Sequence, residues 1–296
     1  MDNYSLPRRI WRIIYPVLIF VGIQLVISIL VSICATVAFT ARGILSGASG
    51  FDPAALTDAV TRFVKENAIT VVFAANIVSY SVFFPIWLRT RDRAVPYNNK
   101  NPVFLGILVI GFFAGFNVVL MWIFGLTDII KYFPSYDDVA EVFTSGSLIM
   151  QIIAAGIAAP VVEELLFRGI LINRMKWLPA WSSVFIQALL FGVVHFNWFQ
   201  SIYAFLAGIL LGLIYVKYRS IILTIIGHIA FNLVSVILSE FLTERTAVVI
   251  VLLCPIITAA CGITLIVRSK STQKNTISEN NAQVLPLDSE RAGPYI

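Results

Sequence analysis

The sequence predicts an all-α fold, a polytopic bundle of about eight transmembrane helices. Of its 296 residues, 59% are hydrophobic and 12% are charged, whereas soluble domains carry about 25% charged residues. A membrane-spanning helix needs about 20 apolar residues, so about eight spans with their loops account for nearly the whole chain. The 21 Lys and Arg residues against 16 Asp and Glu indicate basic loops that orient the chain in a membrane, so we expect no nucleic-acid partner.

The N-terminal part, residues 1–146, is predicted to contain three spans, at residues 13–41, 69–88 and 103–126. Residues 53–66 form a short amphipathic segment that we expect at the membrane interface. The loop 89–101 carries four basic residues, which predicts a cytoplasmic location for this loop and for the N-terminus. The acidic segment 137–141 suits the opposite face.

The central part, residues 147–240, is predicted to form a core of four spans. The first runs from Leu148 to the polar turn 173–179, and the others cover residues 180–197, 199–215 and 221–241. Gly208 and Gly212 form a small-residue face that we expect to contact a neighbouring helix.

The C-terminal part adds an eighth span at residues 247–267, within the segment 241–268. Basic residues follow this span and occupy the turns 173–179 and 217–220, so both termini are predicted to be cytoplasmic. The polar tail, residues 269–296, has too little apolar surface to fold alone, which predicts disorder.

Three charged residues, Glu163, Glu164 and Arg168, lie inside the apolar segment of the fourth span, where charge is costly. Glu164 and Arg168 are four residues apart in the order that favours a helical ion pair. Glu163 points about 100° away around the helix and needs a partner that is distant in sequence. An ion pair with a purely architectural role is the alternative to a functional site.

The chain has only two histidines, His195 and His228, and both fall in predicted spans. Phe191 shares a helix face with His195, and Asn232 shares one with His228, because each pair is four residues apart. Glu163 and His195 are each 16 residues from Pro179, so antiparallel helices would bring them level.

The depth of the two histidines conflicts with straight helices. His195 would lie about 24 Å along its helix from Pro179, and His228 about 13 Å from Arg219. The two sites converge if the hairpin around Pro179 protrudes into the cytoplasm or if the fourth span bends at Pro160.

These residues form three ordered motifs, Glu-Glu-x-x-x-Arg, Phe-x-x-x-His and His-x-x-x-Asn, within residues 147–240. The set resembles the CAAX-protease and bacteriocin-processing family of intramembrane endopeptidases. By this resemblance Glu163 and His195 activate a water molecule, while His228 and Asn232 hold the developing oxyanion. The resemblance implies supporting roles for Glu164, Arg168 and Phe191.

The family resemblance also suggests the substrate. It implies either the C-terminal tripeptide of a prenylated CAAX protein or, in bacteria, a small secreted or signalling peptide such as a bacteriocin leader. We favour the second, with cleavage near the cytoplasmic interface of a prokaryotic plasma membrane. The expected partners are this peptide or protein substrate and the lipid bilayer.

A metal centre is the alternative for the same residues. Glu163, His195 and His228 match a catalytic zinc shell with one position left for water. No His-Glu-x-x-His sequence lies on one helix, so the usual local zinc signature is missing. We therefore favour a glutamate-dependent peptidase without a cofactor, with zinc as the alternative.

Two other classes of function fit the composition. A proton-coupled transporter could use Glu163, His195 and His228 as a relay, but the sequence shows no repeat of short broken spans. A catalytically silent scaffold or immunity partner is the second, and the intact motif set argues against it.

Overall fold

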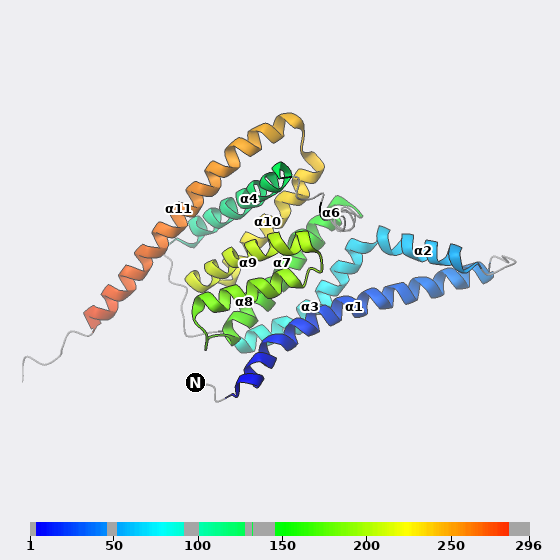
Figure 1. Cartoon of the computed structure of the whole chain (residues 1–296), viewed down its shortest axis with the longest axis horizontal. Coiled ribbons are helices and arrows are strands. Elements are labelled where there is room, and N and C mark those ends of the chain that lie inside the picture. The colour runs from blue at the N-terminus through cyan, green and yellow to red at the C-terminus, as the bar shows by residue number, and fades with distance from the viewer. Residues whose placement is uncertain (1–3, 46–51, 92–100, 128–131, 133–145, 284–296) are drawn as a thin grey trace, which may run out of the picture.

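The computed structural model describes residues 4–45, 52–91, 101–127, 132 and 146–283, in which the regular elements are all helices (Figure 1). Seven of the described helices are long and apolar enough to cross a membrane. The predicted all-α polytopic bundle is therefore confirmed. The predicted acidic segment 137–141 and most of the basic loop 89–101 lie outside the described residues.

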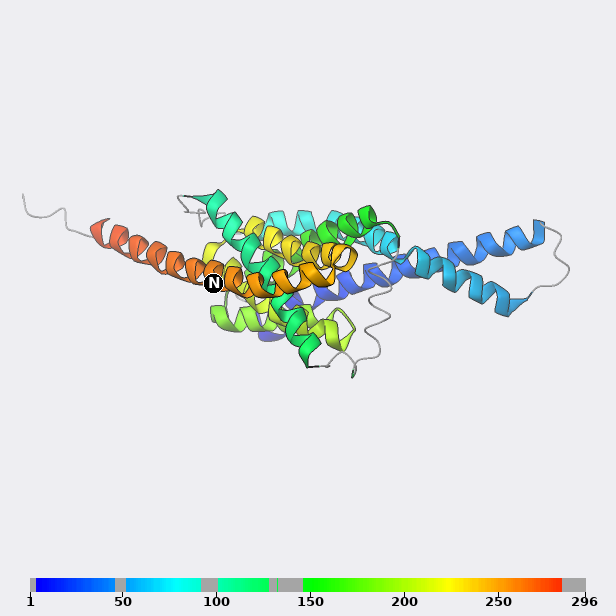
Figure 2. The ribbon, with the colours of Figure 1, turned by 90° about the horizontal axis from the view of Figure 1, so that it is seen from above.

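The first helix is longer than one membrane crossing requires. α1 (Leu6–Leu45) has 40 residues, which is about 60 Å of helix against about 30 Å of hydrocarbon. Its first half packs on the bundle through Ile13, Val17 and Phe20. Its second half extends beyond the bundle together with α2 (Pro53–Glu66), so the two form an arm (Figures 1 and 2).

The amphipathic segment has the bounds that the sequence predicts, because its start is well marked. The Asp52 side chain accepts a hydrogen bond from the Ala54 N–H, and Pro53 fills the first turn of α2. In the structure α2 packs along α1, with an edge-to-face contact between Phe39 and Phe63. Its expected position at a membrane interface stays a prediction.

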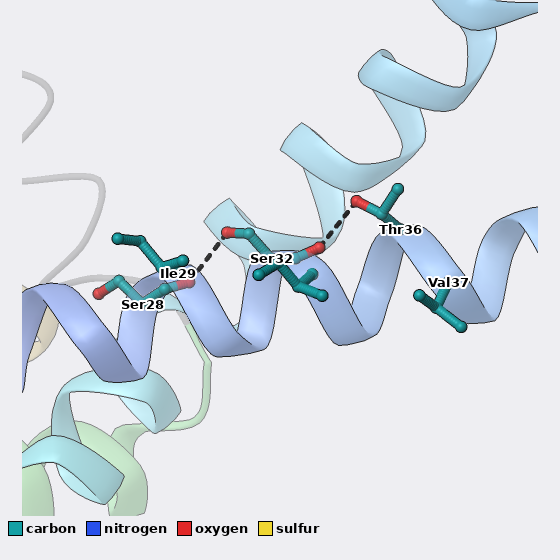
Figure 3. Close-up of a pocket in the computed structure, with 6 residues that line it drawn as sticks. Ser28, Ile29, Ser32, Thr36 and Val37 are labelled. Carbon is teal, nitrogen blue, oxygen red and sulfur yellow. Dashed lines mark hydrogen bonds between the residues drawn. The ribbon is translucent and has the colours of Figure 1, made fainter.

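A row of hydroxyl side chains lies along α1. Ser28, Ser32 and Thr36 each donate a hydrogen bond to the carbonyl oxygen four residues earlier. Figure 3 shows the bonds from Ser32 and Thr36. A shallow groove of about 370 Å³ runs along this face. None of the predicted site residues lines the groove, and the hydroxyls are satisfied within their own helix.

The bundle itself is built from helices that run side by side. α4 (Pro102–Leu126) packs along α10 (Ile221–Phe241) and α11 (Glu244–Gln283), while α3 (Ala68–Thr90) packs along the segment that carries Glu163. The bounds of α10 are those predicted, because the Ser220 side chain caps its first turn.

The glutamate-bearing segment, residues 148–172, is not a uniform α-helix. It consists of α6 (Leu148–Gln151), the π-helical η2 (Ile152–Ala158), α7 (Ala159–Glu164) and the π-helical η3 (Leu165–Ile172). π-Helical turns are rare and occur frequently at functional sites. The short α7, which ends with the two glutamates, therefore lies between two widened turns.

The predicted span at residues 180–197 is wrong in length. α8 (Ala180–Val193) has 14 residues, about 20 Å of helix, and ends before His195. α9 (Trp198–Tyr218) begins at once, because Asn197 is extended and its side chain accepts a hydrogen bond from the Gln200 N–H. His195 therefore lies in the turn between two helices and not inside a span.

The chain turns sharply at Phe196, which has a left-handed φ of 52°. Such a conformation is strained for a bulky residue. The Ser201 hydroxyl and the His195 N–H both donate to the Gly192 carbonyl and hold the turn closed.

The last helix also exceeds its prediction. α11 continues to Gln283, so residues 269–283 are helical where the sequence predicts a disordered tail. The physical reason is that no Gly or Pro interrupts the chain between Arg268 and Gln283. The far end of α11 and the N-terminus lie toward the same end of the bundle, opposite to the α1/α2 arm (Figures 1 and 2).

Candidate active site

Glu164 and Arg168 form the ion pair that their spacing predicts. Arg168 Nη1 lies 2.6 Å from Glu164 Oε1, and both side chains are fully buried. Arg168 Nη2 also donates to the Gly208 carbonyl at 3.3 Å, and the guanidinium lies 4.7 Å from the centre of the Phe191 ring. The cation is thus held on three sides in an apolar interior.

Glu164 has a second partner that sequence spacing does not reveal. Its Oε1 atom, already bound by Arg168, lies 2.8 Å from Nδ1 of His228 on α10. Because a carboxylate only accepts hydrogen bonds, Nδ1 of His228 carries the proton. Glu164 therefore fixes both the orientation and the tautomer of this imidazole.

Glu163 finds the distant partner that its position demands. Nε2 of His228 lies 3.6 Å from Glu163 Oε2, so the imidazole stands between the two adjacent glutamates. The Glu163 side chain is 14% exposed while that of Glu164 is fully buried. The two neighbouring carboxylates thus have different environments, one enclosed and one within reach of a small molecule.

His195 is held by its own helix. Nδ1 of His195 lies 2.7 Å from the Phe191 carbonyl, which can only accept, so the proton is on Nδ1 and the lone pair is on Nε2. The rings of His195 and His228 both contact the Phe191 ring, and His228 lies 3.6 Å from Glu163. The structure therefore brings Glu163, His195 and His228 together.

Phe191 separates and supports these groups. Its ring makes edge-to-face contacts with His195 at 5.0 Å and with His228 at 5.6 Å between ring centres. Phe167 packs against the same ring, so Phe191 has little room to move.

The expected conflict over depth assumed straight helices, and the structure shows that two of them are interrupted. α8 ends at Val193, so His195 lies in the turn that follows, where its Nδ1 atom is 2.7 Å from the Phe191 carbonyl. The segment around Pro160 has π-helical turns on both sides of α7. Protrusion of the hairpin around Pro179 into the cytoplasm stays a prediction.

Asn232 lies one helical turn beyond His228 on α10. Its Nδ2 atom donates to the carbonyl of Ala155 in η2 at 2.9 Å. A carboxamide has two N–H donors, so the second remains for another acceptor. The structure gives Asn232 no direct hydrogen bond to the other predicted site residues.

The donor set gives only partial support to a metal. Glu163, His195 and His228 are suitable ligand types, and the carboxylate of Glu164 on His228 Nδ1 is an arrangement that often supports metal-binding histidines. However, within the described ranges no three His, Cys, Asp or Glu side chains lie at a spacing that would hold a metal ion.

One polar residue in this region was missed by sequence reasoning. Gln187 on α8 is fully buried, and its Nε2 atom donates to the same Gly208 carbonyl that accepts from Arg168. The available signal was a carboxamide inside an apolar segment. Gly208 lies at a helix contact, as predicted, and its carbonyl oxygen in addition anchors these two side chains.

A comparison with protein-family models identifies the segment that contains all of these residues. Residues 145–234 match the model for the type II CAAX prenyl endopeptidase Rce1-like family. This segment is similar to an Rce1-like domain, and we refer to it below by that name. No curated protein and no solved structure matches the chain.

The Rce1-like domain agrees with the resemblance carried by the three motifs. The matched segment, residues 145–234, begins two residues before the predicted core, residues 147–240, and ends six residues before the core ends. The family supports a hydrolase of the peptidase class that acts within the membrane.

Proposed function

We propose that the Rce1-like domain is the catalytic core of an intramembrane endopeptidase that uses glutamate and histidine side chains without a cofactor. The observation that carries the proposal is the position of His228 between Glu164, at 2.8 Å, and Glu163, at 3.6 Å. Such an arrangement supplies a general base and a hydrogen-bond donor within a few ångströms of each other.

The first step in this proposal is the attack of water on the peptide carbonyl. Glu163, assisted by His195, takes a proton from the water molecule. At the same time the oxygen atom of that water bonds to the carbonyl carbon of the peptide. Glu163 suits this role because its side chain is 14% exposed, so its carboxylate can be reached by a water molecule, and because it lies beside His228. Nε2 of His195 can accept a hydrogen bond from the same water because Nδ1 is bonded to Phe191.

The second step is stabilisation of the oxyanion that forms from the carbonyl oxygen. Nδ1 of His228 already donates its proton to Glu164. Nε2 can therefore donate to the oxyanion only when both ring nitrogens carry protons. In this proposal both ring nitrogens carry protons as the oxyanion forms, and the two glutamates lie on either side of the ring. The second N–H of Asn232 is the other donor, with the first held by Ala155. When the C–N bond breaks, the proton taken from water passes to the amine.

The site belongs to the half of the bundle nearer the basic turns. Glu163 is nine residues from the end of η3 at Ile172, about 14 Å, and His228 is seven residues from the start of α10 at Ile221, about 10 Å. Because those helix ends carry Arg174, Lys176 and Arg219, we assign them to the cytoplasmic face, together with both chain termini. Cleavage then occurs in the cytoplasmic half of a prokaryotic plasma membrane.

The substrate in this proposal is a peptide with an apolar segment that can reach the membrane interior. We favour a small secreted or signalling peptide, such as a bacteriocin leader, over a prenylated CAAX C-terminus. The decisive experiment is a cleavage assay in proteoliposomes with matched peptides, one prenylated at a CAAX cysteine and one unprenylated with a leader sequence. Cleavage of neither peptide by the wild-type protein, at any protein-to-lipid ratio, would count against an endopeptidase; cleavage of the prenylated peptide alone would reverse the choice of substrate.

A further inference from the structure

Gln187 is a fully buried carboxamide in the apolar helix α8, outside the three sequence motifs. Its Nε2 atom donates to the Val184 carbonyl at 2.9 Å and to the Gly208 carbonyl at 2.8 Å. Its Oε1 atom has no hydrogen-bond partner. A buried oxygen without a hydrogen-bond partner destabilises the folded protein, so an apolar residue would be more favourable here unless the amide has a specific role.

The Gly208 carbonyl connects Gln187 to the candidate site. It accepts both from Gln187 and from Arg168 Nη2, so two buried donors from two different elements meet at one oxygen. Arg168 Nε is a buried donor without a partner, and Gln187 Oε1 is a buried acceptor without one. These two atoms have complementary hydrogen-bonding character and belong to side chains that share an anchor.

From Arg168 the contacts continue to the imidazole. Arg168 Nη1 holds Glu164 Oε1 at 2.6 Å, and the same oxygen holds His228 Nδ1 at 2.8 Å. A carboxylate oxygen shared by a guanidinium and an imidazole has a narrow range of positions that satisfy both. Displacement of Arg168 would therefore move Glu164 and change the orientation of the His228 ring.

The glycines of α9 make room for this arrangement. A Cβ atom at Gly212 would lie 2.6 Å from Nε2 of Gln187, and one at Gly208 would lie 3.1 Å from Cα of Ala188. Even a methyl group at position 212 would force the Gln187 amide to move. The small-residue face of α9 therefore admits a specific polar side chain in addition to close helix packing.

We propose that Gln187 is a positioning residue of the active site, which fixes the Gly208 carbonyl and, through Arg168 and Glu164, the orientation of His228. Its catalytic meaning rests on the proposed function. The geometry itself can be measured without any activity.

The kinetic test replaces the amide with an apolar side chain of similar length, Gln187→Met. We expect kcat to fall by roughly 10- to 100-fold, as for other residues that orient an active-site group, with KM nearly unchanged. Ser183→Ala is the matched control, because Ser183 is buried one turn earlier on α8 and its hydroxyl bonds the Met175 carbonyl, away from Arg168. Wild-type kcat in Gln187→Met, or an equal loss in the control, would overturn the proposal.

The second readout uses the two histidines of the chain. Diethyl pyrocarbonate modifies imidazole nitrogens, and mass spectrometry separates His195 from His228. In Gln187→Met we expect faster modification of His228 and an unchanged rate at His195, whose Nδ1 bond to Phe191 does not involve Arg168. An unchanged rate at His228 would contradict the positioning role. This readout does not require cleavage of a peptide. It therefore tests the positioning role of Gln187 separately from the proposed endopeptidase function.

A double-mutant cycle with Gly212→Ala provides an independent check. If the added methyl group acts by displacing the Gln187 amide, Gly212→Ala should accelerate modification of His228 in the wild-type background and add little in the Gln187→Met background. Fully additive effects would mean that the two positions act separately, and the proposal would be wrong.

Discussion

Glu164 Oε1 lies 2.8 Å from Nδ1 of His228, although the two residues are 64 positions apart in the sequence. This contact links the helix of the paired glutamates to α10. The two glutamates therefore have different contacts. Glu164 binds Arg168 and Nδ1 of His228, whereas Glu163 faces the other imidazole nitrogen. The functional prediction for each glutamate is therefore different.

Glu163→Gln is expected to abolish proteolysis while leaving membrane insertion and yield intact. The substitution removes the base but keeps the shape, and loss of a general base costs about 10²- to 10⁴-fold. The measurement is the cleavage rate of a reconstituted substrate, with the thermal midpoint of the purified protein as a control. Cleavage at the wild-type rate would show that the role assigned to Glu163 is wrong.

Glu164→Gln should reduce stability as well as activity. The neutral side chain leaves Arg168 buried without a countercharge, and breaking such a pair costs about 3–5 kcal/mol. We expect a lower thermal midpoint and poorer expression than for Glu163→Gln, measured in the same detergent. Equal stability of the two variants would contradict the separate roles of the two carboxylates.

Helix bounds could be predicted from the sequence only where a residue marks the start or end of the helix. α2 and α10 were predicted with their observed bounds because Asp52 and Ser220 mark the helix starts. The boundary near Asn197 was predicted, but the end of α8 at Val193 was missed because residues 194–196, with two apolar side chains and one imidazole, carry no residue that marks a helix end. The motif residues could be selected because charge and imidazole are rare in apolar spans.

Other features could not be obtained from sequence for physical reasons. The π-helical turns η2 and η3 have no sequence signal comparable to an N-cap residue. The contacts of His228 with both glutamates and of Gln187 with Gly208 depend on the relative placement of whole helices. Spacing along one helix supplies neighbours on that helix only.

The assigned orientation predicts which positions are accessible from each side of the membrane. In a variant without Cys34, Cys254 and Cys261, single cysteines at Lys176 and Lys217 should react with an impermeant reagent only after the cells are opened. Cysteines at Leu45, at the end of α1, and Thr243, between α10 and α11, should react in intact cells. All four positions are exposed in the structure. Labelling of Lys176→Cys or Lys217→Cys from outside would reverse the topology.

His228→Ala and Asn232→Ala are each expected to reduce turnover by about 10²-fold or more, the scale known for loss of one oxyanion donor. His195→Ala should cost at least as much through impaired water activation. Asn232 bonds the Ala155 carbonyl, so its variant also needs a stability measurement to separate misfolding from loss of the donor. An Asn232→Ala variant that is stable and fully active would remove Asn232 from the proposed mechanism.

The last prediction concerns metal dependence and rests on the state of His228. In the proposed mechanism Nε2 of His228 donates a hydrogen bond to the oxyanion, so this nitrogen must carry a proton; a metal ligand would need the same nitrogen unprotonated. Asn232, a poor zinc ligand but a good hydrogen-bond donor, lies one turn away on the same helix. Chelators should therefore inhibit weakly, and the purified active protein should contain zinc well below one equivalent, measured by elemental analysis. If the protein instead holds stoichiometric zinc, and its activity is lost on removal and returns on replacement, then Glu163, His195 and His228 are ligands and Glu164 supports a metal-bound imidazole.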